Sequence, residues 1–337
     1  MTPATPTAGR APRRAAVDPH RGATAALPPL SAFHTPSKTK SSLLDDYLQL
    51  FKVRVTSMVV LTAWAGFYLG SVRSGIASFQ WGMVEALLGI GLVSGGASVL
   101  NEVIERRIDA LMLRTAQRPL AAGRIGFAHG LSLGLGCFAA GALILGWFTN
   151  PVTLGLTLAT GFTYVAVYTP LKRYTTIATF IGAFPGALPP LLGWTAARGA
   201  IEWPAVALFA ILFVWQFPHF MSIAWLYRDD YARAGICMLP VVQPDGWSTA
   251  IEALLYALLM IPVSTLPYFL HLAGKAYLGA SVALGLVYLA YAIRFCRITQ
   301  APKARESRRY AHDLLRVSVI YLPLLLTVMM LDATGRR

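Results

Sequence analysis

Three oxygen-bearing side chains recur every fourth residue where a long apolar segment ends. Asn101, Glu105 and Asp109 occupy these positions in N-E-V-I-E-R-R-I-D. On an α-helix this spacing places them on one stripe, because successive members drift by only about 40°. Such a stripe suits Mg²⁺, which proteins bind through one or two carboxylates together with substrate phosphates. The alternative is a solvated helix end whose carboxylates pair with Arg106 and Arg107.

Basic residues at related spacings follow the stripe. Arg114 and Arg118 lie four apart in R-T-A-Q-R-P-L, and a guanidinium group presents a planar fork to phosphate oxygens. Lys172 and Arg173 end a second segment, Y-T-P-L-K-R. All four could instead be ordinary charges that flank membrane helices, and Tyr168 could be an interfacial tyrosine. Their position after a carboxylate stripe favours a diphosphate site.

A histidine and a further carboxylate pair occur later in the chain. His219 lies in the apolar segment W-Q-F-P-H-F, and Asp229 and Asp230 follow. If the chain is helical here, His219 lies about 16 Å deeper than Asp230. A histidine inside a membrane-spanning segment is a functional candidate, because burying it there is costly. The alternative is a packing histidine that bonds to a neighbouring helix.

Membrane helices are the elements that must position these residues. Of the 337 residues, 56% are hydrophobic and 13% charged, against about 25% charged in an ordinary soluble domain. A spanning helix needs roughly 20 apolar residues, and no long segment alternates with the period of a β-barrel strand. We therefore predict an all-α protein with nine transmembrane helices, at 55–72, 82–101, 126–147, 151–168, 177–197, 203–225, 248–271, 275–296 and 313–331.

Charge distribution predicts the orientation of these helices. The chain has a net charge of +14. With nine helices, 24 of the 29 Lys and Arg residues fall on the side of the N-terminus. The positive-inside rule then predicts a cytoplasmic N-terminus and cytoplasmic polar clusters, so the charge indicates topology and not nucleic-acid binding. We expect residues 1–45 to be a disordered, basic, Pro/Ala-rich tail, and 46–335 to form the membrane domain.

Several of these segments together resemble one known family. The segment from Asn101 to Leu120 resembles the first motif of the UbiA superfamily of intramembrane prenyltransferases, and is similar to its haem O synthase branch. The same holds for 168–173, 182–194, 218–220 and 230–242, so the resemblance extends from about 46 to 331. Glu105 and Cys237 depart from the Asp and Pro usual at these positions. Glu105 keeps a carboxylate, so cation binding should survive.

The resemblance implies a reaction and roles for the residues. Farnesyl diphosphate would donate its farnesyl group to a vinyl group of haem b, and water would add, giving haem O and diphosphate. Tyr164 and Tyr168 would stabilise the allylic cation, and His219 would orient the haem, ligate its iron or guide the water. The implied Mg²⁺ ligands are Asn101, Glu105, Asp109 and Asp230, and the implied diphosphate ligands are Arg114, Arg118, Lys172 and Arg173. Asp229 is a weaker candidate, since the matching segment begins at Asp230.

The resemblance also implies a setting, and two other functions stay open. The setting is the bacterial inner membrane, with farnesyl diphosphate, haem b and membrane lipid as partners and a downstream haem A synthase as a candidate partner. One other function is a UbiA-type prenyltransferase with an aromatic acceptor such as 4-hydroxybenzoate. The other is a secondary transporter, although transporters concentrate polar residues near the membrane midplane.

Overall fold

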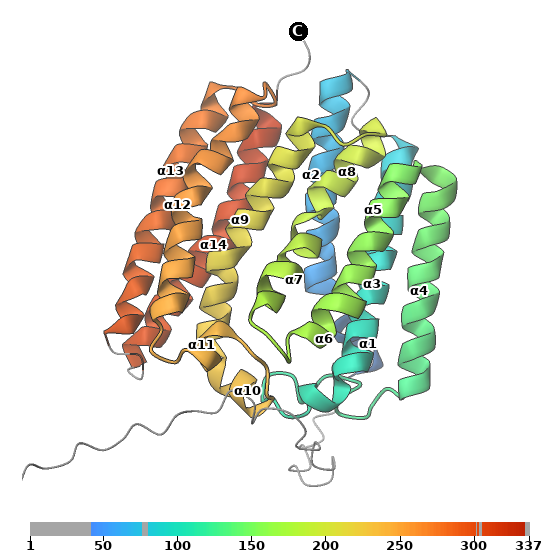
Figure 1. The fold of residues 1–337 in the computed structure, drawn as a ribbon. Helices are drawn as coiled ribbons and strands as arrows, with labels where there is room; N and C mark the ends of the chain where they lie inside the picture. The colour runs from blue at the N-terminus through green and yellow to red at the C-terminus, as the bar shows by residue number, and fades with distance from the viewer. Residues whose placement is uncertain (1–41, 76–79, 301, 303–304, 334–337) are drawn as a thin grey trace, which may run out of the picture. The chain divides into compact units, whose positions relative to one another are not determined.

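The computed structural model describes residues 42–75, 80–300, 302 and 305–333. Within these ranges all regular elements are helices, and nine helical stretches are long and apolar enough to span a membrane (Figure 1), which confirms the predicted class. The long helices are α2 (Val53–Ser74), α3 (Trp81–Asp109), α4 (Phe127–Phe148), α5 (Pro151–Phe162), α7 (Ile177–Ala187), α8 (Pro189–Arg198), α9 (Trp203–Leu226), α12 (Trp247–Phe269), α13 (Lys275–Phe295) and α14 (Arg305–Leu331). The shorter ones are α1 (Leu43–Leu50), α6 (Thr169–Leu171), α10 (Arg228–Arg233), α11 (Leu239–Val242), a π-helix (Thr163–Tyr168) and a 3₁₀-helix (Cys296–Thr299).

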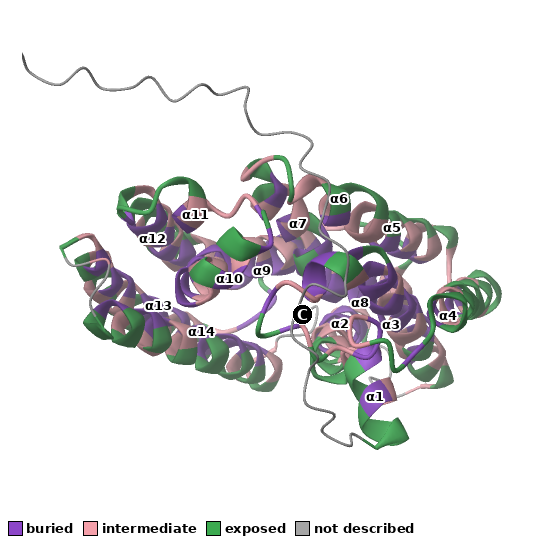
Figure 2. Ribbon diagram, turned by 90° about the horizontal axis from the view of Figure 1, so that it is seen from below, coloured by how far each residue is buried: buried purple, intermediate pink, exposed green. Residues whose placement is uncertain are grey.

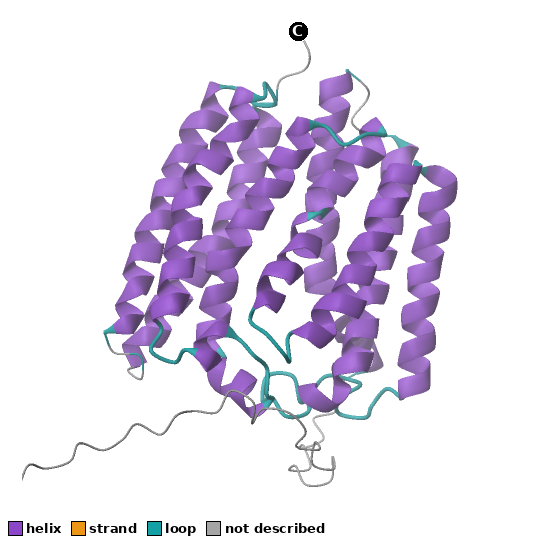
Figure 3. Ribbon diagram, viewed as in Figure 1, coloured by secondary structure: helices purple, strands orange, loops and turns teal. Residues whose placement is uncertain are grey.

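Two of the predicted spans are more complex than single α-helices. The span predicted at 177–197 is divided at Leu188 into α7 and α8, a break visible in Figure 3. Pro189 and Pro190 follow the break, and neither has an amide proton to continue the helical ladder. The span predicted at 151–168 runs from α5 into the π-helix, in which the hydrogen-bond ladder widens to i→i+5.

The first helix begins earlier than the sequence suggested. The expected tail reached residue 45, but α1 starts at Leu43. Ser42 and Asp45 form a capping box, in which the Asp45 amide donates to Ser42 Oγ at 3.1 Å and the Ser42 amide donates to Asp45 Oδ2 at 3.3 Å. The rest of the tail, residues 1–41, lies outside the described residues.

Backbone-to-backbone contact joins α2 to α8. A Cβ atom on Gly66 would lie 1.8 Å from the Pro190 carbonyl oxygen, and one on Gly193 would lie 1.7 Å from the Ala63 carbonyl oxygen. Only glycine allows the two helices to approach this closely. The contact fixes α8 beside α2 and leaves no space between them at this depth.

A large apolar core fills the space among α9, α12, α13 and α14. Its buried side chains include Trp225, Met260, Tyr288 and Tyr321. Figure 2, viewed from below Figure 1, shows these helices beside one another with their buried residues facing inward. Two smaller apolar clusters lie outside this core: one joins α1 to α3 and the loop after it, and the other lies among α2, α3, α4 and α8. The two cavities described below lie on the α2–α8 side of this core.

Candidate active site

Polar side chains from several elements line a cavity of about 170 Å³ at the end of the bundle where α3 ends. We call this cavity the charged chamber. The last turns of α3 supply Asn101, Glu105 and Asp109, so the predicted stripe faces one space. The loop after α3 supplies Arg114 and Arg118, and the remaining polar lining residues are Lys52, Thr115, Tyr164, Tyr168, Lys172 and Tyr231.

Each acidic or amide group of the stripe contacts a cation. Arg118 Nη1 lies 2.8 Å from Asp109 Oδ2, and Lys172 pairs with Glu105. Glu105 and Asp109 are buried. Burying unpaired charges at this depth would be strongly destabilising, and the ion pairs offset that cost. The alternative pairing of these carboxylates with Arg106 and Arg107 does not occur.

Lys52 is a site residue that the sequence analysis counted only as a topology charge. Its Nζ donates to Asn101 Oδ1 at 2.6 Å and to the Tyr164 hydroxyl at 3.3 Å. Burial, followed by repulsion from Arg118, lowers the pKa of Lys52 to about 8. Its φ of 47° lies in the left-handed region, uncommon for a residue with a side chain. That turn between α1 and α2 directs the side chain into the chamber.

Contacts of Arg114 hold the loop after α3 against α10. The Arg114 guanidinium lies 4.5 Å from the centroid of the Tyr227 ring, and its Nη2 donates to the Tyr231 hydroxyl at 3.0 Å. The Arg114 amide donates to Asp230 Oδ2 at 3.3 Å, and the other Asp230 oxygen pairs with Arg233. Asp230 therefore joins the loop after α3 to α10 and does not line the charged chamber.

The loop that carries Lys172 is held in a similar way. The Cys237 amide donates to the Lys172 carbonyl oxygen at 3.0 Å, and Cys237 Sγ contacts the Arg173 carbonyl oxygen at 3.2 Å. A proline, usual here in the family that the sequence resembles, could not donate the first bond. The departure at Cys237 thus adds a contact.

Like Asp230, two further predicted site residues lie outside both cavities. The Arg173 side chain is exposed and does not line the charged chamber. His219 Nδ1 shares a hydrogen bond of 2.8 Å with Ser318 Oγ of α14, and the ring stacks on Trp215. The histidine therefore makes the helix-to-helix contact of the packing alternative. Its neighbour Phe220 lines the second cavity, described next.

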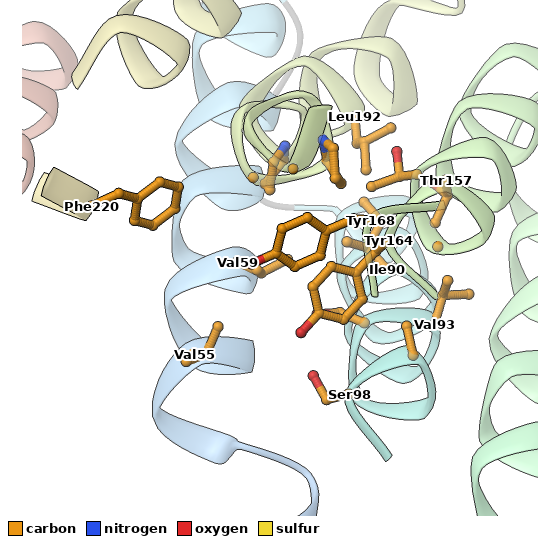
Figure 4. A pocket seen from close by; sticks show the side chains of 18 of the residues that line it. Val55, Val59, Ile90, Val93, Ser98, Thr157, Tyr164, Tyr168, Leu192 and Phe220 are labelled. Atoms are coloured by element: carbon orange, nitrogen blue, oxygen red, sulfur yellow. The ribbon is translucent and has the colours of Figure 1, made fainter. Parts of the chain in front are cut away.

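A mostly apolar cavity of about 360 Å³, the apolar chamber, adjoins the charged one. Tyr164, Tyr168, Tyr231 and Met238 line both cavities. Tyr164 and Tyr168 come from the π-helix, and their stacked rings have centroids 5.7 Å apart (Figure 4). Other lining residues come from α2, α3, α5, α7, α8 and α9. A ligand with an anionic head and a hydrocarbon tail fits this pair of chambers.

The side chain of Asn101 connects Lys52 to the π-helix. Its Nδ2 donates to Thr169 Oγ1 at 2.9 Å, and that hydroxyl donates to the Tyr164 carbonyl oxygen at 2.8 Å. Its Oδ1 accepts from Lys52, so both ends of the amide are occupied. The contacts make Asn101 a positioning residue for the tyrosine pair as well as a candidate metal ligand.

The donor set fits a cation that arrives together with an anionic ligand. Among the described residues, no three His, Cys, Asp or Glu side chains are grouped as a metal site. The expected set of Asn101, Glu105, Asp109 and Asp230 is not brought together, since Asp230 faces Arg233. However, Glu105 and Asp109 both line the chamber, and Asp109 Oδ1 is buried without a hydrogen-bond partner. Two carboxylates plus phosphate oxygens are a usual Mg²⁺ environment.

Comparison with known proteins shows the family to which the chain belongs. The model of the UbiA prenyltransferase family matches residues 59–315, and the chain belongs to that family. A relative from Koribacter versatilis is 53% identical over 87% of this chain and 95% of its own length, and is named protoheme IX farnesyltransferase.

Solved structures of distant relatives share the fold. The structure of a digeranylgeranylglyceryl phosphate synthase superposes with a TM-score of 0.69 at 18% identity, covering 86% of this chain and 98% of that one. The structure of a UbiA homologue from Archaeoglobus fulgidus bound to GPP and Mg²⁺ superposes with a TM-score of 0.55 at 15% identity, covering 84% and 99%.

Proposed function

We infer that this protein is a protohaem IX farnesyltransferase, or haem O synthase. It transfers the farnesyl group of farnesyl diphosphate to a vinyl group of haem b, with addition of water, and releases diphosphate. The name of the 53% identical relative supports the donor and the acceptor. The structural observation that carries the inference is the junction of the charged and apolar chambers at Tyr164 and Tyr168.

The charged chamber binds the diphosphate. Lys52, Arg118 and Lys172 line it and donate charge-assisted hydrogen bonds to phosphate oxygens. Arg114, also in the lining, is held by Tyr227 and Tyr231 and adds positive charge. Glu105 and Asp109 would hold Mg²⁺, which supplies positive charge to the leaving diphosphate; the Archaeoglobus homologue binds Mg²⁺ with GPP. Such preorganised donors are commonly worth about 3–4 kcal/mol each in the transition state.

The two tyrosines lie where the allylic carbon must be. As the C–O bond breaks, its electron pair leaves with the diphosphate and positive charge develops on the farnesyl group. The stacked faces of Tyr164 and Tyr168 stabilise that charge. The vinyl group then attacks and forms the carbon–carbon bond. Water adds to the resulting cation on the porphyrin side and loses a proton, which leaves the hydroxyl group of haem O.

The haem approaches from the α9 side. Phe220 of α9 lines the apolar chamber, and the adjacent His219 faces α14 through Ser318. His219, which lines neither chamber, would act on the haem side by holding this part of α9 against α14. Arg173, exposed beside Lys172, would guide the diphosphate into the chamber from solution.

The setting that we propose is the bacterial inner membrane. The 24-to-5 division of Lys and Arg supports a cytoplasmic charged chamber and a cytoplasmic N-terminus. Farnesyl diphosphate would then enter from the cytoplasm and haem b from the bilayer. A haem A synthase, which consumes haem O, is the partner expected downstream.

Pigment analysis tests the proposed function. The chain is expressed in cells that lack their own haem O synthase, and the membrane haems are extracted and identified by mass. We expect haem O, with an empty vector as control. In vitro, the membranes receive farnesyl diphosphate and either haem b or 4-hydroxybenzoate. Prenylation of the benzoate, or no haem O when haem b is supplied, would contradict the proposal.

A further inference from the structure

The apolar chamber ends at three buried side chains. Ile90 of α3, Thr157 of α5 and Leu192 of α8 line it, with exposed fractions of 1%, 2% and 2%. Figure 4 shows Leu192 and Thr157 at the end of the cavity away from Ser98. This end lies deepest along the helices from the charged chamber.

Beyond this end, tightly packed side chains leave no space for a ligand. Ile90 and Leu192 belong to one apolar cluster with Ala63 and Leu145, both fully buried. The backbone contact of Gly193 with Ala63 lies directly beside Leu192. A ligand tail therefore cannot pass these residues unless side chains are removed.

The depth of the chamber can be measured along α3. Asn101 lines the charged chamber, Ile90 lines the end of the apolar one, and the helix between them is continuous. Eleven residues at about 1.5 Å each give about 16 Å. An extended isoprene unit spans about 5 Å at ordinary carbon–carbon bond lengths of about 1.5 Å. Three units fit this depth, and a fourth does not.

We propose that Ile90, Thr157 and Leu192 form a stop for the prenyl tail and so select a 15-carbon donor over a 20-carbon one. This inference rests on the proposed function and adds the residues that set donor length. The residues of the charged chamber contact the diphosphate and the allylic end of the donor, which are the same in all prenyl donors. The selection must therefore come from the far end of the tail.

Variants that deepen or shorten the chamber test the stop. Membranes carrying each variant receive haem b and equimolar geranyl, farnesyl and geranylgeranyl diphosphates, and the products are separated by mass. We expect Ile90→Ala and Leu192→Ala to raise the geranylgeranyl-to-farnesyl product ratio by at least tenfold. Ser94 lines the chamber about 10 Å from Asn101 along α3, so Ser94→Leu should favour the geranyl product by a similar factor.

A matched truncation controls for general loosening of the protein. Leu325 of α14 is fully buried but lines neither chamber, and Leu325→Ala should leave the product ratio unchanged. Ser94→Leu adds volume and does not hollow the core, so it keeps the test open if a truncated variant does not fold. Product ratios that stay at the wild-type value in all three chamber variants would contradict the proposal that these residues limit the length of the prenyl tail.

A binding measurement separates this inference from the proposed function. Each diphosphate should raise the unfolding temperature of the purified protein according to how well it binds. Wild type should be protected more by farnesyl than by geranylgeranyl diphosphate, and Leu192→Ala should reverse the order. The measurement needs no acceptor. It therefore tests whether Ile90, Thr157 and Leu192 limit the length of the prenyl tail even if no haem product forms. Equal protection by both donors in both proteins would refute the stop.

Discussion

The α2–α8 region and the α12–α14 region are built from similar apolar helices, but the first encloses cavities and the second encloses packed side chains. The first contains the charged chamber and most of the apolar chamber, whereas no residue of α12, α13 or α14 lines either one. In the second region large side chains such as Met260 and Tyr288 fill the interior. One region is hollow and charged, and the other is a solid support against which α9 packs.

Polar groups serve different purposes in the two regions. In the solid region, hydroxyl groups bond to backbone carbonyls of neighbouring helices, as Tyr288 does to Trp215 at 2.9 Å. In the hollow region, buried charges pair with one another around open space, as Arg118 does with Asp109. Such pairs stabilise less than apolar packing would. Their presence beside a cavity therefore indicates function, while the hydroxyl bonds indicate architecture.

The same amide substitution should separate the two regions most sharply. Asp109→Asn removes a buried carboxylate from the charged chamber, and we expect kcat/KM for haem O formation to fall by about 10³-fold, as when a preorganised electrostatic group is lost. Asp313→Asn in α14 alters a carboxylate 3.5 Å from Arg294 outside the chambers. It should change kcat/KM less than twofold. Comparable losses of kcat/KM in Asp109→Asn and Asp313→Asn would contradict the functional difference between the two regions.

Loss of Lys52 should weaken donor binding. Lys52→Met keeps an aliphatic chain but removes the ammonium that lines the chamber, and we expect KM for farnesyl diphosphate to rise about 10- to 100-fold, the loss of one charged hydrogen bond of about 1.5–3 kcal/mol. Lys275→Met, exposed at the start of α13, is the control and should leave KM unchanged. An unaltered KM in Lys52→Met would exclude Lys52 from the diphosphate site.

The pH dependence of donor binding should report the same group. With a pKa of about 8, Lys52 in the free protein is mostly charged at pH 7 and mostly neutral at pH 9. KM for the diphosphate should therefore rise with pH, by up to about tenfold between these values, because less of the charged form remains. In Lys52→Arg the guanidinium stays charged, so the same titration should give a flat profile. A parallel rise in both proteins would assign the effect to another group.

A truncation in the solid region should change stability and leave catalysis intact. Leu325→Ala should lower the free energy of unfolding by about 2–5 kcal/mol, the usual cost of a buried Leu-to-Ala cavity. Turnover per folded molecule should match wild type, since Leu325 contacts no chamber. Denaturation in detergent and activity normalised to folded protein would measure the two effects. A large loss of turnover would show that the solid region takes part in the reaction.

Much of this arrangement can be predicted from sequence because helical periodicity is local. The Asn101–Glu105–Asp109 stripe needs only one regular helix, and the spans need only apolar length. Lys52 could not be found this way, because its role depends on a left-handed turn and on contact with α3. The side chain of Asp230 is likewise aimed by a loop from elsewhere in the chain. His219 and Phe220 are adjacent in sequence and about 100° apart around α9. Because the whole segment is apolar, its hydrophobicity cannot show which of the two side chains faces the apolar chamber.

The glycine contact between α2 and α8 has a consequence for the membrane as an insulator. A bacterial membrane stores energy as an electrical potential, worth about 2.3 kcal/mol for each charge that crosses 100 mV. A cavity with buried cations and room for water would dissipate that store if it continued to the other side. Within the described residues the lining stops at Ile90 and Leu192, where the backbones at Gly66 and Gly193 meet α8 and α2. We therefore expect this tight contact to keep the bilayer sealed against ion leakage while highly charged chemistry proceeds inside it.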